Sequence, residues 1–573
     1  MNIRWMVLSL CIGLYGVVFS SGLPNIVIFL ADDLGIGDVG CFGNTTLPTP
    51  NIDRIASEGA RLTHHLTSSS VCTPSRTSLL TGRYPIRSGL VTSHLLPVIL
   101  FVASAAGLPN NETTFAELAK TQGYSTAVIG KWHLGMSCST YQDFCHHPLN
   151  HGFDYFYGLP LTNLKDFGNS GESVVVSQMP ATNMTLVMSF VLGLLSSAVL
   201  HRKGFISTKF TVLFLGLSTC LPLALYTAYK NITLLNSVML KDFNVIEQPI
   251  RLDSLTRRFT QEGLEFIERQ KRNQQPFLLF LSWTHVHTYL MTGSGFSGRS
   301  QHGRYGDAVM ELDWGVGQIL TALDKHGFTN NTMVYFTSDN GGHIEETEED
   351  GSRVGGYNGI YKGGKTHGAV DGGIRVPTVV RYPGRIKPGR VVDEPTSLMD
   401  FLPTVANLMK APVPSDRVLD GKDMMPLLTG EERLSRHEFL FHYCGKTIHA
   451  IRYRPRQGSD VFKLVLWTPG YIPGQMRCEF VCFCGHATRL STPQLYNMVS
   501  DPGELTPLNV TQHAEYQDIV RLMLKALEEH QASVTPVPDQ YAIMNLMWRP
   551  WLQPCCNFPY CSCQDPKYAS LEP

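Results

Sequence analysis

The sequence carries few charged side chains for its length. Aspartate, glutamate, lysine and arginine together make up 17% of the 573 residues, and the net charge is −1. This composition lacks the basic footprint of a nucleic-acid-binding protein, so we expect no nucleic-acid partner. The length is sufficient for a large hydrophobic core and for two domains.

Histidine pairs at zinc-finger spacing are absent beside the cysteines near the C-terminus. The chain has 14 cysteines, and most of them are clustered. The clusters are Cys138 with Cys145, Cys478 with Cys482 and Cys484, and Cys555 with Cys556, Cys561 and Cys563. Structural zinc remains an alternative for the C-terminal groups. The pattern favours disulfides formed in an oxidising compartment, but it does not determine which cysteines pair.

Residues 1–22 have the character of a secretory signal peptide. Arg4 precedes an apolar run from Met6 to Phe19, and small residues follow it. A run of this length is typical of a cleavable signal, with a membrane anchor as the alternative. Asn-x-Ser/Thr sequons agree with lumenal exposure. They begin at Asn44, Asn111, Asn183, Asn231, Asn330 and Asn509.

Four continuous apolar runs predict buried parallel strands. They occupy residues 24–30, 125–129, 277–281 and 333–337. Helical patterns at residues 113–122 and 307–326 alternate with them. This alternation favours an α/β fold with a mostly parallel central sheet that is covered by helices on both faces. In such a fold, ligands bind beyond the carboxyl ends of the strands.

Oxygen-bearing side chains follow two of these runs. Asp32 and Asp33 come after the first strand, and Asp339 and Asn340 come after the last. All four offer oxygen ligands, which suit a hard cation such as Ca²⁺ or Mg²⁺ better than zinc. A turn or a helix cap is the alternative explanation for an isolated aspartate pair. Acidic groups at two strand ends favour the metal site.

The stretch from Val71 to Pro85 places Cys72 just ahead of a short predicted helix. Free N–H groups and the dipole at a helix N-terminus favour an anionic ligand. Half of a disulfide or an ordinary buried thiol is the alternative explanation for Cys72. The pattern Cys-x-Pro-Ser-Arg, followed by Leu-Thr-Gly-Arg, resembles the signature of the sulfatase family.

This resemblance implies an alkaline-phosphatase-like fold and a specific chemistry. Cys72 would be converted to Cα-formylglycine by a formylglycine-generating enzyme, and the hydrated aldehyde would attack the sulfur of a sulfate ester. The resemblance also implies one bound calcium ion. Its ligands would be Asp32, Asp33, Asp339, Asn340 and residue 72.

Basic residues must complete such a site. Three aspartates and one Ca²⁺ leave a charge of about −1, which repels a sulfate monoester. Arg76 belongs to the signature, while Lys131 and Lys365 lie in Gly-Lys-Trp-His-Leu-Gly and Tyr-Lys-Gly-Gly-Lys, both of which resemble sulfatase motifs. We expect these three cations to orient the sulfate.

Two histidines are expected to move protons. The family pattern indicates that His287, with Lys365, protonates the departing alcohol, and that His133 assists loss of the second diol proton. For His285, a structural and a catalytic role are equally compatible with the sequence. The expected catalytic set is therefore Cys72, Arg76, Lys131, His133, His287 and Lys365.

Two long apolar segments interrupt the alternating pattern. Residues 184–200 and 210–229 contain no charged side chain over 17 and 20 positions. Their lengths predict a transmembrane helical hairpin with its basic tip in the cytosol and both flanks in the lumen. A buried helical pair is the alternative.

The expected domain order follows from these segments. A signal peptide (1–22) precedes the first part of the catalytic domain (23–183), the hairpin (184–230) and the second part of the catalytic domain (231–437). From residue 438 to 573, short strand-like runs and cysteines predict a smaller α+β subdomain with an antiparallel sheet.

The hairpin and three short stretches narrow the resemblance to a branch containing steroid sulfatases and arylsulfatases D, E, F and H. The stretches are Ser300–Gly303, Asp143–His147 and Leu161–Leu164. This branch implies hydrolysis of 3β-hydroxysteroid sulfates at the endoplasmic reticulum membrane, with residues 184–230 in contact with lipid. The alternatives are a non-steroid arylsulfatase substrate, a Golgi or other secretory-pathway membrane, or a non-catalytic lumenal membrane-anchored binding protein. One departure is Asp371, where related sequences usually carry glutamate.

Overall fold

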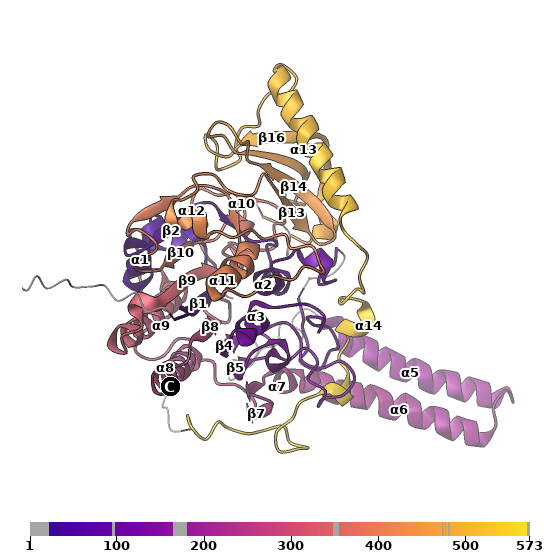
Figure 1. The fold of residues 1–573 in the computed structure, drawn as a ribbon. Coiled ribbons are helices and arrows are strands. Elements are labelled where there is room, and N and C mark those ends of the chain that lie inside the picture. The colour runs from indigo at the N-terminus through magenta and orange to yellow at the C-terminus, as the bar shows by residue number, and fades with distance from the viewer. Residues whose placement is uncertain are drawn as a thin grey trace, which may run out of the picture.

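The computed structural model describes residues 22–93, 98–163, 180–347, 354–472, 475, 477–478 and 482–569. The expected signal peptide lies outside these residues, apart from Gly22. The described chain forms an α/β body, a second sheet near the C-terminus and a projecting helical hairpin (Figure 1).

A ten-stranded sheet forms the centre of the body, in the order β11-β2-β10-β9-β1-β8-β4-β5-β6-β7. Five adjacent strands run parallel: β9 (Thr332–Ser338), β1 (Asn25–Ala31), β8 (Phe277–Ser282), β4 (Ser125–Lys131) and β5 (Tyr155–Leu159). The flanking strands are β2 (Ala60–Leu62), β6 (Met239–Lys241), β7 (Asn244–Glu247), β10 (Thr378–Arg381) and β11 (Arg390–Val392). All four apolar runs are therefore strands of the parallel core, as predicted.

Strand β1 lies in the middle of this core. Each of its residues is buried. Ile28 aligns with Phe280 of β8 on one side and with Tyr335 of β9 on the other. A strand covered on both faces has no solvent side, so its sequence is continuously apolar rather than alternating.

Helices cover both faces of the sheet. Helix α9 contacts α8 and α1, whereas α11 contacts α2 and α3, and both α8 and α3 lie against β4. Their bounds are α1 (Pro50–Ser57), α2 (Cys72–Thr81), α3 (Phe115–Thr121), α8 (Leu255–Asn273), α9 (Gly303–Lys325) and α11 (Phe401–Met409). Helix α3 begins after Thr114, whose hydroxyl accepts from the Glu117 N–H at 3.2 Å while Glu117 accepts from the Thr114 N–H. This reciprocal cap explains where the predicted helix starts.

The C-terminal part forms a separate four-stranded antiparallel sheet, in the order β13-β14-β15-β16. Helix α13 packs against β13 and β14 at the top of Figure 1. The bounds are β13 (Phe439–Cys444), β14 (Thr447–Tyr453), β15 (Phe462–Thr468), β16 (Thr488–Asn497) and α13 (Ala514–Ala532). Other strands and α-helices of the described chain are short: β3 (His65–Leu66), β12 (Thr396–Ser397), α7 (Ile232–Asn236), α10 (Asp371–Ile374), α12 (Met425–Thr429) and α14 (Ile543–Leu546). The antiparallel sheet agrees with the sequence prediction.

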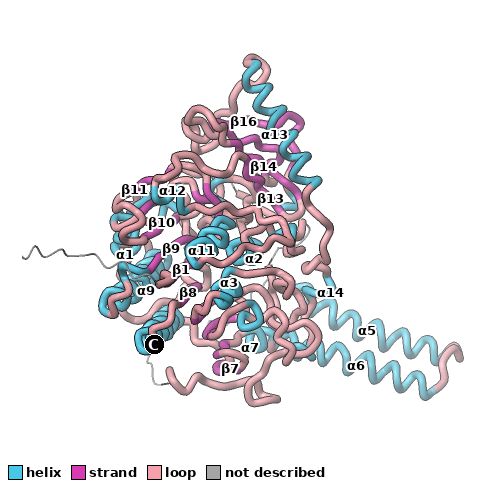
Figure 2. Tube along the Cα trace, in the orientation of Figure 1, coloured by secondary structure: helices cyan, strands magenta, loops and turns pink. Residues whose placement is uncertain are grey.

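The apolar segments form two long helices that pack side by side and project from the body (Figures 1 and 2). They are α5 (Pro180–Arg202) and α6 (Thr208–Lys230). The predicted helical hairpin is therefore present. Its transmembrane character is not supported, because none of the helices, as far as their residues are described, combines the length and apolar character needed to cross a bilayer.

Ten cysteines form five disulfides. The pairs are Cys138–Cys145, Cys444–Cys484, Cys478–Cys482, Cys555–Cys561 and Cys556–Cys563. The C-terminal clusters are thus disulfides, as favoured, and not zinc ligands. Among the described residues, Cys41, Cys72 and Cys220 are outside disulfides.

Candidate active site

The polar ends of neighbouring parallel strands meet at one edge of the central sheet. Asp32 and Asp33 directly follow β1, Asp339 and Asn340 directly follow β9, and Lys131 is the last residue of β4. Since β9, β1, β8 and β4 are consecutive in the sheet, these side chains gather at their carboxyl ends. The N-terminus of α2 brings Cys72 to the same place, as its contacts with Asp32 show.

Three carboxylates and one thiol form the centre of the site. Ligand atoms of Asp32, Asp33, Cys72 and Asp339 all lie within 4.8 Å of one another, and all four residues are buried. Asn340 donates from Nδ2 to Asp33 Oδ1 at 2.8 Å, which leaves its own Oδ1 buried without a hydrogen-bond partner. Buried carboxylates with an unpaired amide oxygen are a donor set that fits a hard divalent cation.

Each carboxylate also faces one cation. Lys131 Nζ lies 2.5 Å from Asp32 Oδ2, and Lys365 Nζ lies 2.6 Å from Asp33 Oδ2. Arg76 donates from Nε to Asp339 Oδ2 at 2.9 Å. Three negative and three positive side chains cancel, so a divalent ion would make the pocket positive. A positive, dehydrated pocket attracts an anionic substrate strongly.

The ion pairs and burial shift the pKa values of the acidic groups in opposite directions. Burial, reinforced by the nearby Asp32, raises the pKa of Asp339 to about 6. Burial also acts to raise the pKa of Asp33, but Lys365, His287 and Lys131 together outweigh it and hold that pKa below its usual range. Paired cations are therefore needed to keep this group of carboxylates ionised.

Cys72 is the first residue of α2 and is only 1% exposed. Its Sγ lies 3.7 Å from Asp32 Oδ1. Burial raises the pKa of the thiol to about 12. An unmodified Cys72 is therefore protonated at neutral pH and is a poor nucleophile, because the thiolate is the reactive form.

His287 lies at the edge of the cluster. Its Nε2 is 3.9 Å from Asp33 Oδ2, and its Nδ1 is 2.5 Å from the Thr288 carbonyl oxygen. Burial and the nearby Lys365 lower the pKa of His287 to about 3. With Nδ1–H bonded to the carbonyl, Nε2 is the nitrogen that faces the site.

His133 has a comparable arrangement. Its Nε2 donates to the Ile99 carbonyl at 2.9 Å, and its buried Nδ1 has no hydrogen-bond partner. Burial and the neighbouring Lys131 lower its pKa well below the usual value. The neutral ring therefore keeps an acceptor nitrogen free to take a proton.

The structure resolves the open question about His285. Its Nε2 lies 2.9 Å from Glu311 Oε2 on α9, while its carbonyl accepts from the Asp32 N–H at 2.9 Å. The side chain thus points to a helix rather than into the carboxylate cluster. His285 supports the backbone beside Asp32.

Ser282, the last residue of β8, was missed by the sequence analysis. Arg76 Nη1 donates to Ser282 Oγ at 2.6 Å and to the Lys131 carbonyl at 3.1 Å, which fixes the guanidinium between two strand ends. The signal was available, because Ser282 is the first polar residue after the apolar run 277–281.

Asp371 lies outside the carboxylate cluster. Its carboxylate accepts from Arg452 and from Lys463 Nζ, the latter at 2.8 Å, and also lies 3.1 Å from Arg375 Nε. Its hydrogen bonds with Arg452 and Lys463 and its ion pair with Arg375 are formed despite the shorter side chain. Arg452 and Lys463 belong to β14 and β15, so Asp371 joins the body to the second sheet.

Comparisons with known proteins identify relatives of this chain. A family model described as "Sulfatase" matches residues 24–411, and a model described as "C-terminal region of aryl-sulfatase" matches residues 435–563. The chain is 47% identical to human steryl-sulfatase, with 94% of both chains covered. It is 44% identical to human arylsulfatase D, with 95% of this chain and 92% of the relative covered.

A solved structure is also similar. The PsFucS1 sulfatase from Pseudoalteromonas sp. superposes with a TM-score of 0.68 and is 25% identical in sequence. The match covers 90% of this chain and 92% of that chain.

Proposed function

Because this chain belongs to the sulfatase family and is a hydrolase of sulfate esters, we propose that it works through a formylglycine at position 72 and one calcium ion. The observation that carries this proposal is the buried group of three carboxylates and three cations around Cys72. A neutral, buried thiol cannot act as the nucleophile itself, which favours its conversion by a formylglycine-generating enzyme.

Calcium would be held by Asp32, Asp33, Asp339, Asn340 and residue 72. When bound, the ion supplies positive charge against a sulfate oxygen and so favours the transition state. Lys131, Lys365 and Arg76, each paired with one of the carboxylates, orient the sulfate. Burial of the whole cluster excludes water, which strengthens each of these charge interactions.

Residue 72 provides the nucleophile as an aldehyde hydrate. One hydroxyl gives its proton to a carboxylate of the cluster and forms a bond to sulfur, while the bond from sulfur to the alcohol oxygen breaks. The ammonium of Lys365, next to the neutral His287, delivers a proton to the departing alcohol oxygen, and the proton released by the attacking hydroxyl restores that ammonium. His133 Nδ1 then takes the proton of the second hydroxyl, so that sulfate leaves and the aldehyde is restored.

We further propose that the substrate is a 3β-hydroxysteroid sulfate. The support is the similarity to steryl-sulfatase over nearly the whole chain. An arylsulfatase with a non-steroid substrate is the second candidate, since the identity to arylsulfatases D and H is almost as high. Turnover of steroid sulfates against small aryl sulfates, compared by kcat/KM, separates the two.

The proposed location is the lumenal side of the endoplasmic reticulum membrane, with the Golgi as the alternative. Support comes from apolar side chains on the outside of the hairpin. Leu192 and Leu195 are each 58% exposed, and Leu213 and Leu217 are each 55% exposed. Such a surface favours contact with lipid. Co-flotation of the purified protein with phospholipid vesicles tests it, and failure to float contradicts the lipid contact.

Peptide mass spectrometry of the segment around position 72 is the direct test of the proposed nucleophile. We expect an aldehyde in place of the thiol in protein that turns over substrate. A fully active preparation in which Cys72 is entirely unmodified contradicts the mechanism. An inactive preparation in which Cys72 is unmodified would instead favour a non-catalytic chain with a relic site.

A further inference from the structure

A cavity of about 890 Å³ lies beside the active site and is lined by a different set of residues. Its walls are the loop after Asp33, the end of β2, the N-terminal end of α9 and the loop that precedes Lys365. None of the residues assigned above to catalysis or metal binding lines it. The cavity is within the size range of small-molecule sites.

Two of the walls are fixed against each other by main-chain contacts. The Gly37 N–H donates to the Tyr357 carbonyl at 2.9 Å, and the Tyr357 N–H donates to Asp38 Oδ2 at 2.9 Å. A Cβ at Gly35 would lie 2.3 Å from the Tyr357 carbonyl oxygen, so this close approach requires glycine. The cavity is therefore preformed, which lowers the entropic cost of binding a ligand.

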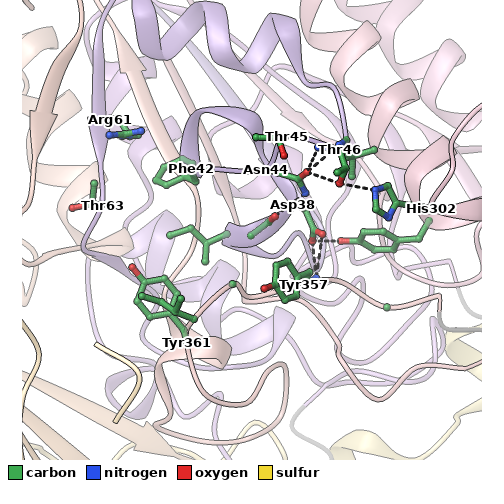
Figure 3. Close-up of a pocket in the computed structure, with 18 residues that line it drawn as sticks. Asp38, Phe42, Asn44, Thr45, Thr46, Arg61, Thr63, His302, Tyr357 and Tyr361 are labelled. Carbon is green, nitrogen blue, oxygen red and sulfur yellow. Dashed lines mark hydrogen bonds between the residues drawn. The ribbon is translucent and has the colours of Figure 1, made fainter. Parts of the chain in front are cut away.

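Aromatic rings line the cavity. Figure 3 shows Phe42 on one side and Tyr357 and Tyr361 on the other. The Tyr361 ring is held in place by Arg375, whose guanidinium lies 4.4 Å from its centroid and donates to its hydroxyl at 2.8 Å. Tyr357 is 61% exposed. Facing rings of this kind suit a flat or ring-shaped organic body.

Most polar groups of the lining already have protein partners. Asp38 accepts from Tyr305 at 2.6 Å as well as from two backbone N–H groups, and Thr63 donates to Asp393. His302 and Thr46 bond to each other at 2.9 Å. These groups therefore offer few free hydrogen bonds to a ligand that is rich in hydroxyl groups.

Arg61 is different. Its Nη1 donates to the Cys41 carbonyl, but its Nε has no hydrogen-bond partner. In the described part of the chain, no carboxylate lies within ion-pair distance of it, and its guanidinium sits 5.8 Å from the Phe42 ring centroid. An uncompensated guanidinium beside aromatic walls attracts an anionic group.

We propose that this cavity is a second ligand site, which binds a ring-shaped organic monoanion, aromatic or alicyclic, separately from the catalytic cluster. The rings of Phe42, Tyr357 and Tyr361 receive the ring body, and Arg61 receives the anionic group. Such a ligand has two sources, which are another molecule of the sulfate ester or an unrelated ring-bearing acid.

The test uses full-length Cys72→Ala protein and calorimetric titration with naphthalene-2-sulfonate, which contains no ester to hydrolyse. Excess inorganic sulfate is present to fill the catalytic cluster. We expect saturable binding to one site, at least tenfold weaker with Arg61→Gln or Tyr357→Ala and largely retained with Arg61→Lys. The exposed residues Arg521 and Tyr560 provide controls, and Arg521→Gln and Tyr560→Ala leave the affinity unchanged.

Two further measurements test which ligand chemistry the cavity binds and whether binding occurs there. Neutral 2-naphthol should bind at least tenfold more weakly than the sulfonate, and equal binding overturns the role of Arg61. In the wild-type enzyme, inorganic sulfate that saturates the catalytic cluster should leave the affinity for the sulfonate unchanged. Purely competitive inhibition that Arg61→Gln does not alter, or no binding at millimolar probe, overturns the second site. A hydrolysable steroid sulfate and a steroid carboxylate, titrated in parallel, distinguish the two sources.

Discussion

Cys72 is buried, outside disulfides and surrounded by carboxylates and cations. Among the described cysteines, only Cys72 has all three properties together. We predict that Cys72→Ala abolishes turnover, because the side chain that becomes the nucleophile is removed. The fold should persist, with a stability loss of about 1 kcal/mol for one small buried group. Assays with a sulfate ester, together with thermal unfolding, check both parts.

Cys41 provides the control for this substitution, since it is also outside disulfides but does not belong to the group of Asp32, Asp33 and Asp339. Cys41→Ala should retain activity. Turnover by Cys72→Ala at a rate close to that of the unaltered protein would contradict the assignment of residue 72 as the nucleophile.

The ion pair of Lys365 with Asp33 allows a second prediction. Lys365→Met leaves a buried carboxylate without its cation, which costs about 3–5 kcal/mol of stability. Turnover should fall by about 100-fold, because one charge that stabilises the transition state is lost. Urea unfolding and steady-state kinetics measure the two effects.

The exposed pair Lys446–Asp539, at 2.7 Å, is the matched control. Lys446→Met should change stability by no more than about 1 kcal/mol, as is usual for surface pairs. Equal effects of the two substitutions would contradict a special role for Lys365.

Residues at strand ends were the most predictable part of the site. Asp32, Asp33, Asp339 and Asn340 follow continuous apolar runs, and the geometry of a parallel sheet brings such positions together. Lys365 and His287 could be assigned only from family motifs, because their loops carry no periodic signal. The sequence could not place His285, since its partner Glu311 lies on a helix that is distant in the chain.

At the scale of elements, the buried charges around Asp371 connect the body to the C-terminal sheet. Lys463 of β15 lies 2.8 Å from Asp371 Oδ1 and 2.6 Å from Glu504 Oε1. We predict that Lys463→Met costs about 3–5 kcal/mol, because two buried carboxylates lose a shared partner. Denaturant unfolding followed by circular dichroism provides the measurement.

Lys525 on α13 belongs to the same subdomain and pairs with Glu529 at 3.7 Å on the exposed surface. Lys525→Met should therefore cost no more than about 1 kcal/mol. If Lys463→Met is equally mild, the contact between body and second sheet does not depend on this charge cluster.

The central strands were predictable because each is a continuous apolar run. The short strands at the sheet edges were not predicted. Strand β10 spans four residues and runs antiparallel between β9 and β2, an arrangement set by long-range pairing rather than by its own pattern. The helices of the hairpin were predictable from their apolar length, whereas their proposed relation to a membrane depends on surroundings beyond the chain.

At the scale of the whole molecule, a divalent ion would change both charge and stability. The three carboxylates and three cations of the cluster cancel, so an ion adds two positive charges to a buried site. We predict that exhaustive chelation abolishes turnover and lowers the Tm, because an ion that binds only the folded state stabilises it. Enzyme assays and calorimetry before and after EDTA treatment test this.

Adding Ca²⁺ back should restore activity and Tm, whereas Zn²⁺ should not, since the donor set consists of hard oxygen atoms. Undiminished turnover after complete removal of divalent ions would exclude a metal role for the carboxylates.

The near-complete enclosure of position 72 has a consequence for the timing of maturation. A modifying enzyme must bind the chain on both sides of the residue that it alters. In the folded protein, the residues around Cys72 are almost entirely buried. The proposed oxidation must therefore take place while the polypeptide is still open, before strand and helix close over it. A molecule that folds before it is modified remains inactive. The fraction of active enzyme therefore depends on the rate of modification relative to the rate of folding.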